Sequence, residues 1–183
     1  MIKEITEKWI NLIDNSKESC YCIVVSRNDF PYISDKCKTR TDVAFISIEA
    51  SPTCAKHYLK DKIYHHLSSE KYNVLNITFD DITQNKKCID ENGDEYMVYT
   101  ITEAQADVAY RFIKNNLGKH FIIHCRAGQS RSQAFYRFIM DCFNEQYKEC
   151  YINKYNPCLT PNIEVLCKLK RQFYQDQNVF KKN

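Results

Sequence analysis

The chain has 183 residues, which is enough for one domain that buries a core without disulfide or metal staples. Its formal net charge of +3 is small, and no run of lysine or arginine marks a surface for nucleic acid or for an anionic membrane. No stretch approaches the roughly 18 apolar residues of a membrane span, and the charged start differs from a signal peptide. We therefore expect a soluble, cytoplasmic protein that does not bind a membrane.

Ten cysteines are a high count for this length. Without a secretory signal, they are better explained as reduced thiols than as a disulfide framework. The chain also lacks a Cys-x-x-Cys pair, so we expect no metal site.

The first half of the chain alternates strand and helix patterns. Residues 3–14 space their apolar side chains as an amphipathic helix does, and we expect this helix to cover a face of a sheet. Further apolar runs predict strands at residues 21–26, 43–48 and 73–79 and a helix at residues 54–68. This alternation predicts a single α/β domain over residues 1–183, with a central, largely parallel sheet flanked by helices.

Charged residues follow two of these strands. Ligands of such sheets bind at the carboxyl ends of the strands, so Asp80 and Asp81 are candidates for a carboxylic acid in catalysis. Arg27 is a weaker candidate for a phosphate contact, since a structural or surface role is the expected one. Asn92 and Gly93 predict the turn of a β-hairpin within residues 87–99, which can gate a pocket, bind substrate or be a surface ornament.

A helix with clear start and end signals precedes the next strand. Thr102 and Gln105 form a capping box, and Gly118 is predicted to be the C-cap. The buried face of this helix is expected to contain Val108, Ala109, Phe112, Ile113 and Leu117.

The stretch with the most chemical information is FIIHCRAGQSRS, residues 121–132. Its apolar start predicts a buried strand, and the apolar residues from 134 to 143 recur with the period of a helix. A loop between a strand and a helix N-terminus directs several backbone N–H groups at one anion and so favours phosphate. The positive helix end also lowers the pKa of Cys125 and makes it nucleophilic, while Arg131 supplies a planar fork for two phosphoryl oxygens.

The other residues of this stretch have supporting roles. Gly128 allows a tight turn or a positive φ beneath the anion, and Ser132 can donate its hydroxyl to the sulfur when the thiolate leaves. His124 is predicted to orient the nucleophile, with an ordinary buried histidine as the alternative. The residues expected to surround the phosphate are Arg126, Ala127, Gly128, Gln129, Ser130 and Arg131.

These residues resemble a known family. HCRAGQSRS resembles the signature loop of the protein tyrosine phosphatase superfamily, and its Gly, Ser, Arg, Ser pattern is similar to that of the dual-specificity branch. Residues 156–162, NPCLTPN, resemble the segment after the catalytic helix in that branch, where an Asn braces the phosphate loop. Asn162 takes this position, and Thr160 and Pro161 are expected to be the N-cap and first residue of a final helix.

The resemblance implies a cysteine-dependent phosphatase that acts through a phosphocysteine intermediate, without metal or cofactor. Its expected substrate is a phosphorylated protein, at phosphotyrosine and at phosphoserine or phosphothreonine. The resemblance favours Asp81 over Asp80 as the general acid, although Asp81 lies 44 residues before Cys125, a longer separation than is usual in the family. We interpret the hairpin within residues 87–99 as an insertion that accounts for the difference.

Other functions remain open at this point. RNA 5′-triphosphatases use the same loop, and nucleic acid would be a partner only in that case. A phosphopeptide-binding module that has lost its catalysis is a further alternative, although both Cys125 and the candidate acids are present. A phosphoinositide substrate is disfavoured, because Arg126 and Gln129 stand where lipid-directed relatives tend to have lysines.

Overall fold

The computed structural model describes residues 2–15, 20–59, 67–143, 147–150 and 160–180. Its centre is a five-stranded sheet in which the strands have the order β3-β2-β6-β1-β7 and all neighbours are parallel. The strands are β1 (Cys20–Ser26), β2 (Val43–Glu49), β3 (Val74–Thr78), β6 (His120–Cys125) and β7 (Tyr147–Cys150). The predicted α/β class with a largely parallel sheet is confirmed.

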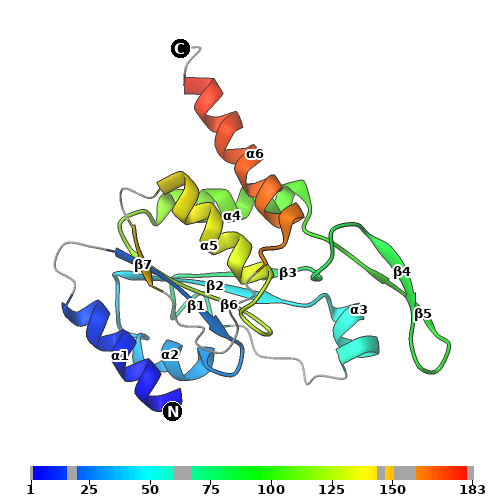
Figure 1. The fold of residues 1–183 in the computed structure, drawn as a ribbon, viewed down its shortest axis with the longest axis horizontal. Coiled ribbons are helices and arrows are strands. Elements are labelled where there is room, and N and C mark those ends of the chain that lie inside the picture. Colours follow the sequence, from blue (N-terminus) through cyan, green and yellow to red (C-terminus); the bar gives the residue numbers. More distant parts are fainter. Residues whose placement is uncertain (1, 16–19, 60–66, 144–146, 151–159, 181–183) are drawn as a thin grey trace.

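Helices cover both faces of this sheet (Figure 1). One face packs against α4 (Glu103–Asn115), α5 (Arg131–Phe143) and α6 (Ile163–Phe180). The other face packs against α1 (Ile2–Asn15) and α2 (Phe30–Lys36). None of the helices in the described ranges is long and apolar enough to cross a membrane.

The central strand β6 contributes side chains to both layers, because successive residues of a strand point to opposite faces. Phe121, Ile123 and Cys125 belong to the core on the side of α4, α5 and α6. Ile122 belongs to the core on the side of α1 and α2, and His124 contacts Phe30 of α2 on that side. The last residue of β6, Cys125, is therefore directed toward α5.

Two elements of this sheet and its covering layer were not predicted from the sequence. The short edge strand β7, with the sequence YKEC, lacks the apolar run that identifies a buried strand. The helix α2 has only seven residues, too few to establish a helical period. The predicted helix at residues 3–14 is confirmed as α1, which buries Trp9 and Ile13 against the sheet.

The helix α4 confirms its predicted start but corrects its predicted end. Thr102 and Gln105 form the capping box, in which each side chain accepts a hydrogen bond from the backbone N–H of the other residue. At the other end the C-cap is Asn116, and Gly118 follows two residues later with φ +85°. Gly118 thus turns the chain after the helix has already ended.

The buried face of α4 also differs from the prediction at one position. Val108 is 55% exposed, whereas Ala106 and Tyr110 are buried. The ring of Tyr110 packs edge-on against Phe138 of α5, so the larger aromatic side chain occupies the core and the helix turns Val108 to solvent. The amphipathic spacing alone did not show whether α4 would bury Val108 or Tyr110.

A β-hairpin projects from the sheet beside a short helix (Figure 1). Its strands are β4 (Lys86–Ile89) and β5 (Glu95–Val98), so the hairpin predicted within residues 87–99 is confirmed, with Gly93 at φ +85° in the turn.

The short helix is α3 (Pro52–Cys54), and it continues as a π-helical turn, η1 (Ala55–Leu59). The helix predicted at residues 54–68 thus begins two residues earlier than expected, because Ser51 is its N-cap and Pro52 takes the first turn. Residues 67 and 68 are not helical, and residues 60–66 of the prediction lie outside the described ranges.

Candidate active site

The loop of residues 125–131 lies between a strand and a helix, as predicted, since Cys125 ends β6 and Arg131 begins α5. Gly128 within it has φ +70°, and a Cβ atom there would lie 2.9 Å from the backbone oxygen of Val25. Both the backbone conformation and the contact with β1 therefore require glycine. The N–H of Arg27 donates to the carbonyl oxygen of Arg126 at 3.1 Å, which fixes the start of the loop to the end of β1.

The sulfur of Cys125 is buried beneath this loop, with the residue only 2% exposed. Its Sγ lies 3.1 Å from the Oγ of Ser132. Burial by itself would raise the pKa of the thiol, but the charge of Arg131 and hydrogen bonds from Ser132 and from the N–H of Gly128 outweigh it. The pKa of Cys125 is consequently lowered from its ordinary value of 9.0, which favours the nucleophilic thiolate.

The side chain of Arg131 is held from the opposite side by the ends of two strands. Its Nη1 donates to the carbonyl oxygens of Phe79, at 2.7 Å, and of Glu49, at 3.1 Å. Its Nε is buried and has no hydrogen-bond partner among the described residues. Since buried donors are normally satisfied, this nitrogen is available to an acceptor on a ligand.

Asp81 is joined to the loop by its carboxylate. Its Oδ1 accepts hydrogen bonds from the Oγ of Ser130, at 2.6 Å, and from the Nδ2 of Asn162, at 2.9 Å. Its other oxygen, Oδ2, has no hydrogen-bond partner within the described part of the chain. One oxygen thus positions the carboxyl group, and the other can exchange a proton.

Asp80 has a different environment from its neighbour. It is 2% exposed, and its oxygens accept from the N–H of Ser51 at 2.9 Å, the Oγ of Ser51 at 2.7 Å and the N–H of Tyr99 at 2.8 Å. Asp80 therefore joins the start of α3 to the end of the hairpin. These bonds use both oxygens of Asp80, whereas Oδ2 of Asp81 has no partner in the described part of the chain.

Asn162 links three parts of the site. Its backbone N–H donates to the carbonyl oxygen of Ser130 at 3.2 Å, and its Nδ2 donates to Asp81 and, at 3.2 Å, to the carbonyl oxygen of Ile82. These contacts connect the loop of residues 125–131 to the segment that contains Asp81 and Ile82. Asn162 is the residue that the sequence resemblance placed in this supporting position.

The start of the final helix corrects the sequence prediction. Thr160 and Pro161 precede the helix and do not begin it, because α6 starts at Ile163. The residue with N-cap geometry is Asn162, whose Oδ1 accepts from the N–H of Val165 at 3.3 Å. Residues 156–159 of the predicted motif lie outside the described ranges.

Two predicted residues lie on the other face of the sheet. The Nε2 of His124 is 2.8 Å from the Oγ of Ser47, and its ring packs on Phe30 of α2. The side chain of His124 therefore lies on the face of the sheet opposite to that of Cys125. Arg27 forms a buried ion pair with Glu49. Arg27 and His124 line a separate cavity of about 240 Å³, so the structural role expected for Arg27 is the observed one.

Most of the remaining predicted residues line one pocket of about 440 Å³, whereas Gly128, Ser132 and Asn162 are not among its lining residues. The loop contributes Cys125, Arg126, Ala127, Gln129, Ser130 and Arg131. The segment after β3 contributes Asp80, Asp81 and Ile82, so the carboxyl ends of β3 and β6 meet here as expected.

The hairpin supplies residues that the sequence analysis missed. Lys86, Cys88, Tyr96 and Val98 line the same pocket. They form two cross-strand pairs, Lys86 with Val98 and Cys88 with Tyr96, so they share one face of the hairpin. The Asn92 and Gly93 turn was sufficient to predict this pairing, but no local signal showed which face would meet the pocket.

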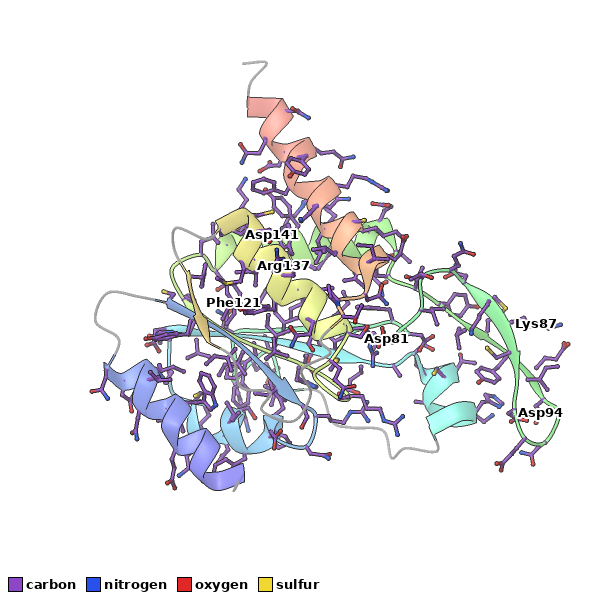
Figure 2. All side chains as sticks on the ribbon, viewed as in Figure 1. Asp81, Lys87, Asp94, Phe121, Arg137 and Asp141 are labelled. Atoms are coloured by element: carbon purple, nitrogen blue, oxygen red, sulfur yellow. The ribbon has the colours of Figure 1, made fainter. Side chains whose placement is uncertain are left out.

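One group of described residues has ligand atoms close enough to hold a metal ion: His57, Asp90 and Asp94. Asp90 and Asp94 lie at the tip of the hairpin and His57 lies on η1, and Figure 2 shows Asp94 well away from Asp81. Asp90 accepts hydrogen bonds from the N–H groups of Asn92 and Asp94. These bonds stabilise the turn, which accounts for an aspartate at this position without a metal ion.

The chain was compared with models of known protein families and with curated proteins. No model of a known protein family matches it, and no curated protein matches it either. The resemblance to the tyrosine phosphatase superfamily therefore rests on the sequence of residues 124–132 and 156–162.

Proposed function

We propose that this protein is a cysteine-dependent phosphatase that hydrolyses phosphate monoesters on protein side chains. The observation that carries the proposal is the Cys125 thiol with its lowered pKa, at the base of a pocket and within hydrogen-bond reach of Ser132. The loop beside it begins a helix, so its backbone N–H groups favour a phosphoryl group.

In the first step the Cys125 thiolate attacks phosphorus in line with the leaving oxygen. The S–P bond forms and the P–O bond to the substrate breaks, while Asp81 gives its proton to the departing oxygen. Arg131 and the loop N–H groups stabilise the charge on the equatorial oxygens, an electrostatic contribution that commonly dominates such catalysis.

In the second step water releases the phosphoryl group. The Asp81 carboxylate takes a proton from the water, whose oxygen attacks phosphorus as the S–P bond breaks. The Ser132 hydroxyl, 3.1 Å from the sulfur, stabilises the thiolate that leaves. Phosphate departs and Cys125 is regenerated.

The proposed substrates are proteins that carry phosphotyrosine and phosphoserine or phosphothreonine, the class implied by the dual-specificity resemblance of residues 124–132. The proposed compartment is reducing, such as the cytoplasm, because a thiolate nucleophile must stay reduced. The free state of the eight cysteines whose side chains the structure describes supports this proposal.

The test is hydrolysis of para-nitrophenyl phosphate over a range of pH in the presence of EDTA. Cys125→Ser should abolish turnover, because serine is not ionised near neutral pH. Asp81→Asn should reduce kcat by about 10²-fold and remove the fall in rate at higher pH, since that limb reports loss of the acid proton. Asp80→Asn is the matched control and should keep that limb.

Other outcomes would replace the proposal. An inactive wild type that binds vanadate would indicate a phosphate-binding module. Faster release of phosphate from an RNA 5′-triphosphate than from any phosphopeptide would indicate a triphosphatase. Activity that survives Cys125→Ser would exclude the cysteine mechanism.

A further inference from the structure

The two faces of the hairpin of β4 and β5 differ in their exposure to solvent. Its inner face lines the pocket of Cys125, and there Tyr96 and Val98 are only 7% and 4% exposed. Its outer face carries Ile89, which is 67% exposed, and Met97, which is 36% exposed. One complete face of the hairpin is therefore a wall of the pocket.

This wall is fixed at both ends. At its base, Asp80 accepts from the N–H of Tyr99 at 2.8 Å and donates its own N–H to the carbonyl oxygen of Tyr99 at 2.7 Å. At its tip, the Nδ1 of His57 lies 2.9 Å from Asp90, and the His57 ring stacks on Tyr96 with 5.1 Å between the centroids. The segment Ala55–Leu59 thus contacts the hairpin through Asp90 at the tip and through Tyr96 on the inner face.

Five charged residues line the pocket. The positively charged ones are Lys86, Arg126 and Arg131, and the negatively charged ones are Asp80 and Asp81. Arg131 is held by carbonyl oxygens, Asp80 by Ser51 and Tyr99, and Asp81 by Ser130 and Asn162.

Lys86 differs from these three groups, because its exposed side chain has neither a hydrogen-bond nor an ion-pair partner in the part of the chain that the structure describes. The next residue, Lys87, points to the other face and forms an ion pair with Glu95. In Figure 2, Lys87 lies on the side of the hairpin away from Asp81.

We propose that the inner face of the hairpin is a substrate-recognition wall, and that Lys86 binds an acidic side chain next to the phosphorylated residue of a protein substrate. The inference rests on the proposed phosphatase function. A pocket of about 440 Å³ is within the range of sites that enclose a whole ligand, so it has room for more than the phosphoryl group.

The lining favours a peptide as the substrate. The phosphate occupies the loop, and the apolar wall formed by Tyr96, Val98 and Ile82 contacts the side chain that carries it. A flanking carboxylate then complements the positive charge of Lys86 and Arg126. A nucleic acid would need a longer track of cations, which the small net charge of +3 does not favour.

The experiment compares kcat/KM for three synthetic phosphotyrosine peptides. The first has Glu on both sides of the phosphotyrosine, the second has Gln at the same positions, and the third has phosphoserine there. Wild type should prefer the first peptide to the second, and Lys86→Gln should reduce this preference by about two- to fivefold, the range expected for one exposed charge pair. High salt should reduce the wild-type preference as well, because salt screens exposed charges.

Lys87→Gln is the matched control, since it makes the same change on the outer face and should keep the wild-type preference. Equal preferences in the two variants, or a wild type that does not distinguish Glu from Gln, would overturn the inference while the phosphatase function stands.

A Lys86 effect confined to the third peptide would assign the residue to a second phosphate and not to a carboxylate. A Lys86 effect seen only with an RNA 5′-triphosphate would overturn the peptide assignment. Failure of wild type on para-nitrophenyl phosphate would instead remove the proposed function itself.

Discussion

At the scale of single residues, Gly128 determines whether the loop of residues 125–131 can form. We expect Gly128→Ala to lower stability and to reduce phosphatase activity more than tenfold. The left-handed φ of +70° costs a residue with a side chain about 1–2 kcal/mol, and the new Cβ would also press on the backbone of β1, 2.9 Å from the oxygen of Val25.

Gly93 offers a matched control for this change. Its φ is +85°, but a Cβ there would have no atom within 4 Å. Gly93→Ala should therefore show the conformational cost of about 1–2 kcal/mol alone and retain activity. Urea unfolding and phosphatase assays at low urea on both variants separate the cost of the positive φ from the cost of the contact between residue 128 and Val25. Equal losses of stability and activity would show that the contact with β1 is unimportant.

Among residues, the sequence predicts those whose role is fixed by local spacing. Cys125, Gly128 and Arg131 lie within one short loop, so a pattern in the sequence is enough to place them. The choice between Asp80 and Asp81 is different, because both follow β3 and both line the pocket. In the structure they differ in their hydrogen bonds, because Asp80 is bound to Ser51 and Tyr99, whereas Asp81 is bound to Ser130 and Asn162.

At the scale of elements, Asn162 couples the start of α6 to the active site, and two substitutions separate these roles. Asn162→Ala removes both the N-cap and the Nδ2 donor, and we expect it to cost about 1 kcal/mol of stability together with activity. Asn162→Asp keeps a good N-cap acceptor but loses the donor and places a second carboxylate beside Asp81.

The Asn162→Asp variant should therefore unfold at nearly the wild-type urea concentration yet show an altered pH–rate profile. A neighbouring negative charge disfavours loss of the proton from a carboxyl group. Because the reaction needs the protonated acid, the limb that falls with pH should move to higher pH. A profile identical to wild type would show that Asn162 does not act through Asp81.

Elements with local signals were predictable, and elements defined by packing were not. The capping box of Thr102 and the turn at Gly93 are complete within a few residues, and both are confirmed. The exposure of Val108 depends instead on Tyr110 packing against Phe138, which lies on another helix. The inner face of the hairpin likewise depends on its contacts with α3 and with His57.

At the scale of the whole molecule, the order of the strands positions the site. The nucleophile lies on β6, which is central, and the acid follows β3, with β2 between the two strands. Glu49 at the end of β2 and Phe79 just after β3 hold Arg131 by their carbonyl oxygens. The sequence predicts a parallel sheet but not this order, because residues far apart in the chain decide which strands are neighbours.

Buried thiols in this fold predict a loss of stability in alkaline solution. Burial raises the pKa of Cys37, which is 1% exposed, to about 11 from the ordinary value of 9.0. Between these two values the unfolded chain loses a proton that the folded chain keeps. Because the unfolded state then binds fewer protons, the free energy of unfolding falls as pH rises, by up to about 1.4 kcal/mol per pH unit for one such group.

The matched variant is Cys37→Ala, which removes this titration at the cost of a small cavity. The cavity lowers the free energy of unfolding by the same amount at every pH, so the slope carries the information. We expect urea unfolding with reductant, at intervals from pH 8 to pH 10.5, to give a flatter curve for the variant than for wild type. Parallel curves would mean that the Cys37 thiol titrates alike in both states, and the alkaline slope would then have to come from other groups with raised pKa values, such as Cys54 and Cys142.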